Sequence, residues 1–158
     1  MGKQKKLLFA TLLIWLSSQL YINYYISNFK FSFAGVLFPV FLFMYSELNP
    51  ILLGISSGVS LFFFRILFFV IGGGTFSQAV IAFYPEAIFY MVYGVAFSYM
   101  AKLFDSINMS KMFFIALGCD FISNFVEVYI RLGNKFFTNN LIILKSLVVV
   151  ALIRASIG

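Results

Sequence analysis

The stretch that decides the fold runs from Ile51 to Ile71 and reads ILLGISSGVSLFFFRILFFVI. It holds a single charged residue, Arg65, in a run as long as the roughly 20 apolar residues that a helix needs to cross a bilayer. Asn49 and Pro50 precede it as a turn signal and a helix start, and three glycines at 72–74 follow and disfavour a longer helix. The sequence therefore predicts a membrane-spanning helix here.

The composition of the whole chain extends this prediction. Of 158 residues, 63% are apolar and 10% are charged, and the mean hydropathy is +1.03. A soluble domain carries roughly 25% charged residues. Eleven basic and five acidic residues are too few to cover a water-soluble globule of this size. The composition argues against a soluble enzyme and predicts one domain, residues 1–158, embedded in a lipid bilayer.

Six apolar stretches are candidates to cross the membrane. Their expected bounds are about 7–26, 33–46, 51–71, 79–101, 111–130 and 138–157. Runs of this length exceed a spanning strand of about 9–11 residues, which favours helices over a barrel. The second stretch is short and contains Pro39. The expected fold class is all-α, a polytopic bundle of six transmembrane helices.

Lysine and arginine in the loops predict the orientation, because cytoplasmic loops carry an excess of both. With the N-terminus inside, six of these residues lie in inner segments and three in outer segments. The inner ones are Lys3, Lys5, Lys6, Lys102, Lys111 and Arg154, and the outer ones are Lys30, Arg131 and Lys135. An even number of spans then places both termini in the cytoplasm. We expect a multi-pass protein of a bacterial cytoplasmic membrane.

No catalytic, metal-binding or cofactor-binding pattern is present in the sequence. The chain has no histidine, and its one cysteine, Cys119, has no second cysteine to pair with. The glycines at 72–74 are not followed by the lysine of a phosphate-binding loop. The net charge of +6 is scattered between apolar runs, whereas nucleic-acid binding needs clustered basic residues. We therefore expect neither enzymatic activity nor a nucleic-acid partner.

Ionisable residues inside the spans predict a binding site. Each costs about 2.5–3.5 kcal/mol to insert and by default marks a functional position. Five lie within the expected spans: Arg65, Glu86, Asp120, Glu127 and Lys145. The predicted orientation places all five between the membrane centre and the outer face. This convergence predicts an outward-facing polar pocket for a small extracytoplasmic ligand.

Helical spacing adds two residues to the candidate ligand-binding set. Asp120, Asn124 and Glu127 are spaced i, i+4, i+7 and share one face of a helix. Glu86 and Tyr90 share a face of the preceding helix, and Lys145 would lie beside the set. The alternative is that the charges only pair, Arg65 with Glu86 and Lys145 with Glu127, and hold the bundle together.

A second helical face predicts close packing instead of ligand binding. Gly54, Ser57 and Gly58 lie on one face of the third stretch. The spacing Gly-x-x-x-Gly lets two membrane helices approach closely. We assign these three residues to helix packing.

Two segments carry a resemblance to a known group of membrane domains. Asn49–Gly58 (NPILLGISSG) and Tyr84–Gly94 (YPEAIFYMVYG) resemble the N-terminal membrane domains of LytS-like and clostridial-type sensor histidine kinases. The resemblance covers about residues 33–101. It implies a receptor module without catalysis, which works as a homodimer and passes its signal to a kinase domain beyond residue 158.

Two other functions remain open. The same loose group holds the substrate-binding components of energy-coupling-factor vitamin transporters, which dock their partner subunits through small residues on the first helix, commonly Ala-x-x-x-Ala. The corresponding segment, Ala10–Ile14, lacks the second alanine. The third function is a membrane scaffold of the cell-wall machinery that binds no ligand.

Overall fold

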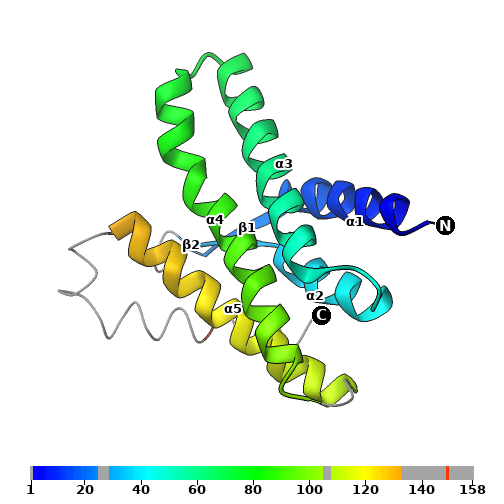
Figure 1. The fold of residues 1–158 in the computed structure, drawn as a ribbon. Helices are drawn as coiled ribbons and strands as arrows, with labels where there is room; N and C mark the ends of the chain where they lie inside the picture. The colour runs from blue at the N-terminus through cyan, green and yellow to red at the C-terminus, as the bar shows by residue number, and fades with distance from the viewer. Residues whose placement is uncertain (1, 25–28, 105–107, 133–148, 150–158) are drawn as a thin grey trace.

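The computed structural model describes residues 2–24, 29–104, 108–132 and 149. Within them the chain forms five helices and one two-stranded sheet (Figure 1). The elements are α1 (Lys3–Ser18), β1 (Tyr21–Tyr24), β2 (Phe29–Ser32), α2 (Ala34–Met44), α3 (Pro50–Ile71), α4 (Phe76–Ala101) and α5 (Met109–Leu132). Apart from residue 149, the expected sixth span at 138–157, with Lys145, lies outside the described residues.

Three helices, α3, α4 and α5, are long and apolar enough to cross a membrane. Their positions agree with the stretches expected at 51–71, 79–101 and 111–130. At 1.5 Å per residue, the 22 residues of α3 measure about 33 Å, close to the thickness of a hydrocarbon core. Large apolar side chains are exposed on all three helices, among them Phe63, Leu67, Ile71, Phe76, Ile81 and Phe114. These features are compatible with a membrane protein.

Local capping fixes where the two central helices begin. The Asn49 side chain accepts hydrogen bonds from the backbone N–H groups of Ile51 (2.9 Å) and Leu52 (3.3 Å), at the start of α3. Thr75 and Gln78 form a reciprocal capping box at the start of α4. Between the two helices, Gly73 has a φ of 91°, a backbone conformation that residues with a side chain rarely adopt.

The first expected span is wrong in its extent and in part of its structure. We expected a helix over 7–26, but α1 ends at Ser18, where the Ser17 and Ser18 hydroxyls donate to the Ile14 and Trp15 carbonyls. Residues 21–24 and 29–32 then pair as antiparallel strands. Hydropathy does not separate a strand from a helix, and tyrosine and isoleucine favour strands. The other described elements are all helices, so the all-α fold class is confirmed apart from this short hairpin.

The structure does not support the expected count of six transmembrane helices. Helix α2 has 11 residues, about 16 Å at 1.5 Å per residue, which is half the roughly 30 Å of a hydrocarbon core. It contains Pro39, as the sequence indicated. Within the described residues, five helices are present and three of them reach spanning length.

Glycines set the distance between α3 and α4, which run antiparallel (Figure 1). A Cβ atom placed on Gly54 would lie 2.6 Å from the Tyr90 carbonyl oxygen, and one on Gly94 would lie 2.4 Å from the Pro50 carbonyl oxygen. A Cβ atom on Gly58 would likewise lie 2.6 Å from a carbonyl oxygen of α4. The two backbones are therefore in direct contact at these positions.

Helix α1 lies along α3, and their contacts advance in the same direction along both helices. Thr11 Oγ1 is 3.0 Å from Ser56 Oγ, and the Trp15 ring stacks on Phe64 with 4.1 Å between centroids. Helix α5 packs on the other side of the α3–α4 pair, against α4. The end of α1, the last third of α3 and the first third of α4 consequently lie at one end of the bundle.

Candidate functional site

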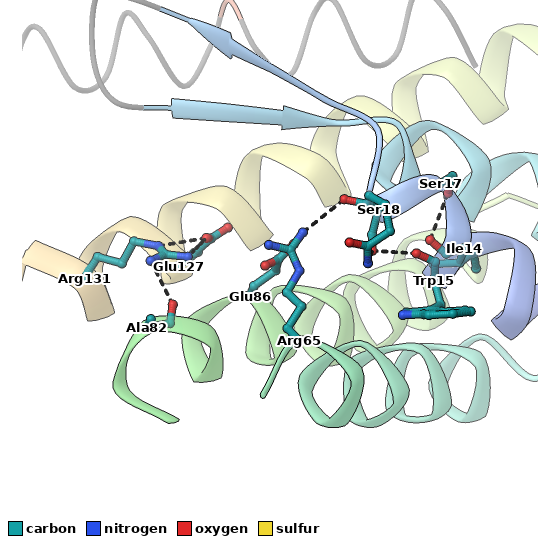
Figure 2. A network of polar contacts seen from close by, with 10 residues as sticks. Ile14, Trp15, Ser17, Ser18, Arg65, Ala82, Glu86, Glu127 and Arg131 are labelled. Carbon is teal, nitrogen blue, oxygen red and sulfur yellow. Dashed lines mark hydrogen bonds and ion pairs between the residues drawn. The ribbon is translucent and has the colours of Figure 1, made fainter. Parts of the chain in front are cut away.

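An ion pair joins α3 and α4 near this end of the bundle. Arg65 Nη2 of α3 is 2.9 Å from Glu86 Oε1 of α4 (Figure 2). The two side chains are 12% and 14% exposed. Removing one partner of a buried pair costs about 3–5 kcal/mol, because a charge remains in a poorly solvated place. The structure thus brings together two of the candidate residues as the pair that we had considered.

Arg65 also contacts α1 and an aromatic ring of α4. Its Nη2 donates to the carbonyl oxygen of Ser18, the last residue of α1, at 3.1 Å. A cation at this position is favourable because the C-terminal end of a helix carries partial negative charge. The guanidinium carbon lies 5.6 Å from the centroid of the Phe83 ring. One side chain therefore connects three helices.

A second ion pair lies on α5. Arg131 Nη2 is 2.8 Å and Nε 2.9 Å from Glu127 Oε1, one helical turn away. Arg131 Nη1 also donates to the Ala82 carbonyl oxygen of α4 at 3.3 Å, one turn before Glu86. Figure 2 shows these contacts in one row with those of Arg65. We call the region formed by Ser18, Arg65, Glu86, Glu127 and Arg131 the charged end.

Arg131 was not among the predicted site residues, and we expected it in an outer loop. In the structure α5 continues to Leu132, so Arg131 belongs to the helix. The spacing of Glu127 and Arg131, i and i+4, is the usual one for an ion pair on a helix surface and could have identified it. The alternative partner of Glu127, Lys145, lies outside the described residues.

Asp120 and Asn124 lie in the interior, not at the charged end. They are 2% and 1% exposed. Asn124 Nδ2 donates to Asp120 Oδ2 and to the Asp120 carbonyl oxygen, both at 2.7 Å. At 1.5 Å per residue, Asp120 is about 10 Å along α5 from Glu127. This spacing places a second polar group deeper in the bundle.

The other candidates occupy the core and the helix contact. Tyr90 is 1% exposed, and its ring lies 6.1 Å from that of Phe38 of α2. Ser57 is buried, and Gly54 and Gly58 lie against the α4 backbone. The candidate set therefore falls into a charged end, a buried polar pair on α5 and a packing face.

The chemistry available at the charged end is ion pairing and hydrogen bonding. No group of three or more Cys, His, Asp or Glu suited to a metal ion is present within residues 2–24, 29–104 and 108–132. Comparison with protein-family models, curated proteins and solved structures finds no match.

Proposed function

We propose that the chain is an integral-membrane ligand-binding domain of the sensory kind, without catalysis, and that its ligand binds at the charged end. The observation that carries this proposal is the largely buried Arg65–Glu86 pair, which also holds the last carbonyl of α1. A ligand group that competes for Arg65 or Glu86 changes contacts among three helices at once. Differential binding to the two arrangements then shifts the equilibrium between them, which is the physical basis of a sensor.

The proposed orientation makes this end accessible from outside the cytoplasm. Arg65 lies six residues before the end of α3, about 9 Å at 1.5 Å per residue. Lys3, Lys5 and Lys6 begin α1 at the opposite end of the bundle, and lysines favour the cytoplasmic side. We therefore propose cytoplasmic termini and an extracytoplasmic ligand.

The surroundings of α1 favour a sensor over a transporter component. Ala10 and Thr11 belong to the segment through which the transporter components dock, and both are buried here. Thr11 contacts Ser56 of α3 within the same chain. A face already packed inside the domain offers little surface to a partner subunit.

A thermal-shift screen of the purified protein with vitamins, amino acids and short peptides tests the proposal. A ligand stabilises the folded state by RT ln(1 + [L]/Kd), about 2.7 kcal/mol at 100 times Kd. We expect one compound class to raise the melting temperature of the wild type and to lose most of this effect in Glu86→Gln. The matched control is Glu47→Gln, which removes a carboxylate from the Lys6 ion pair at the opposite end.

Two outcomes would contradict the proposal. Stabilisation that is equal in the wild type and in Glu86→Gln would place the ligand elsewhere. A screen in which no compound changes the melting temperature would favour the scaffold function, which needs no ligand.

A further inference from the structure

Two buried N–H donors lie where α1 meets the charged end. Trp15 Nε1 and Arg65 Nε are both buried, and neither has a hydrogen-bond partner within the part of the chain that the structure describes. Buried donors in folded proteins are nearly always paired, and an unpaired one costs free energy. Two such donors in one region therefore indicate a group that accepts hydrogen bonds.

The contacts of Trp15 and Arg65 place both donors at the same α1–α3 contact. The Trp15 ring stacks on Phe64, the neighbour of Arg65 in the sequence. Arg65 in turn donates to Ser18, one turn after Trp15, and the Ser18 hydroxyl donates to the Trp15 carbonyl oxygen. In Figure 2 the nitrogen-bearing edge of the indole is turned toward Arg65.

The charges at this place favour a neutral acceptor over an anion. The charge of Arg65 is already compensated by Glu86 at 2.9 Å. A carboxylate or phosphate bound to Arg65 would be repelled by that carboxylate in a region of low dielectric constant. A carbonyl oxygen has two lone pairs, can accept two N–H donors and carries no net charge.

We infer that Trp15 Nε1 and Arg65 Nε donate to neutral carbonyl oxygens of an amide or ester that carries an apolar chain. The rings of Phe64 and Phe83, which contact Trp15 and Arg65, supply apolar surface for that chain. The inference rests on the proposed function because it names the ligand group for the same site. Two sources have this chemistry: a small amphiphilic amide, and the acyl ester of a membrane lipid.

Trp15 is the only tryptophan in the chain, so an indole signal from the protein comes from this residue alone. Ultraviolet resonance Raman spectra contain an indole band that depends on hydrogen bonding at Nε1. The wild-type protein is measured in dodecyl maltoside, which has no carbonyl group, and then with decanamide or with decane as the apolar control. It is also measured in nanodiscs of diester phosphatidylglycerol and of the matching diether lipid.

We expect the band to move to its hydrogen-bonded position with a carbonyl donor and to stay unchanged with decane or diether lipid. A change with decanamide alone assigns the site to an amphiphilic amide, and a change with diester lipid assigns it to the bilayer. The band could instead have its hydrogen-bonded position already in detergent and stay unchanged with decanamide and with diester lipid. That result would assign the donors to water and overturn the inference.

Two conservative variants test the donors separately. Trp15→Phe keeps a ring on Phe64 and removes the N–H group, and Arg65→Lys keeps the positive charge opposite Glu86 and removes Nε–H. We expect each to weaken decanamide binding about fivefold to tenfold in a thermal-shift titration, as for one lost hydrogen bond. Tyr99→Phe, which removes one hydroxyl from an exposed ring near the other end of α4, should leave the affinity unchanged.

The failure of this inference is distinguishable from the failure of the proposed function. If another compound stabilises the protein in a Glu86-dependent manner while Trp15→Phe and Arg65→Lys bind carbonyl compounds like the wild type, only the carbonyl site is refuted. If diester lipid moves the Trp15 band but no compound of the screen stabilises the protein, the carbonyl site stands and the sensory proposal falls.

Discussion

The Arg65–Glu86 pair leads to a quantitative prediction on stability. Arg65→Met removes the guanidinium that faces the Glu86 carboxylate, and Glu86→Leu removes the carboxylate. Because both side chains are mostly buried but not fully so, we expect each change to destabilise by about 3 kcal/mol, the lower end of the range for a broken buried pair. Arg65→Met should cost more than Glu86→Leu, since Arg65 also donates to the Ser18 carbonyl.

The double variant distinguishes an ion pair from two independent contacts. A buried pair replaced by apolar residues is often neutral for stability, so we expect the double variant to be more stable than Arg65→Met alone. The coupling energy between the two changes should be at least about 2 kcal/mol. Reversible unfolding in mixed micelles of dodecyl maltoside and sodium dodecyl sulfate, followed by circular dichroism, provides the free energies.

The same cycle at the other end of α1 is the control. Lys6 and Glu47 also form an ion pair, but their side chains are 24% and 48% exposed, so their coupling should be much smaller. Effects of Arg65→Met and Glu86→Leu that add to within about 0.5 kcal/mol would refute the reasoning, since they would show that the pair contributes no mutual stabilisation.

Three further predictions concern packing, pH and orientation. Gly94→Ala places a Cβ atom where α3 and α4 touch and should destabilise by at least about 1–3 kcal/mol in the same unfolding assay. The hydrogen bond from Lys6 lowers the pKa of Glu47 below its ordinary value of 4.5. The Lys6–Glu47 pair therefore stabilises the fold above pH 4.5, and this contribution is lost as the pH falls through the lowered pKa. The free energy of unfolding, measured against pH, should decrease over this range in the wild type but not in Glu47→Gln. A membrane-impermeant maleimide should label Ser77→Cys in intact cells and Lys102→Cys only after permeabilisation, because the two exposed positions lie at opposite ends of α4.

Each of these predictions has a control and a contradicting result. Gly2→Ala adds a Cβ atom with nothing within 4 Å and should be neutral, and equal effects of the two glycine changes would contradict close packing. An unchanged pH dependence in Glu47→Gln would exclude that carboxyl as its source. The wild type is the control for labelling, because its single cysteine, Cys119, is buried. Labelling of Lys102→Cys in intact cells would reverse the proposed orientation.

Helix boundaries were predictable where local side chains set them. Asn49 and Pro50 cap and start α3, and the glycines at 72–74 end it, so its expected bounds differ from the structure by one residue. The end of α1 was not predictable from hydropathy, because the apolar character continues through Tyr21 and Ile22 into a strand. The hydroxyls of Ser17 and Ser18 supplied a signal, since serine near a helix end bonds to the preceding turn.

The charged end was predictable only in part. Arg65 and Glu86 have opposite charges at similar depth on consecutive helices, and this is enough to suggest the pair that the structure contains. The use of the Ser18 carbonyl depends on where α1 ends, and that end lies eight residues before the expected end at residue 26. Asp120 and Glu127 lie on one face of α5, which suggested that both line the same site, but they lie at different depths along the helix. Helical spacing alone also does not show that the Asp120 carboxylate is already hydrogen-bonded to Asn124 of the same helix.

Helix α1 is held at both ends by residues that come much later in the sequence. Lys6 pairs with Glu47, 41 residues on, and Ser18 accepts from Arg65, 47 residues on. At about 5–20 residues per second, a ribosome needs roughly 2–9 s to supply those partners. During synthesis α1 is thus made several seconds before the residues that hold its two ends. The contact at Ser18 therefore forms only once α3 has been made.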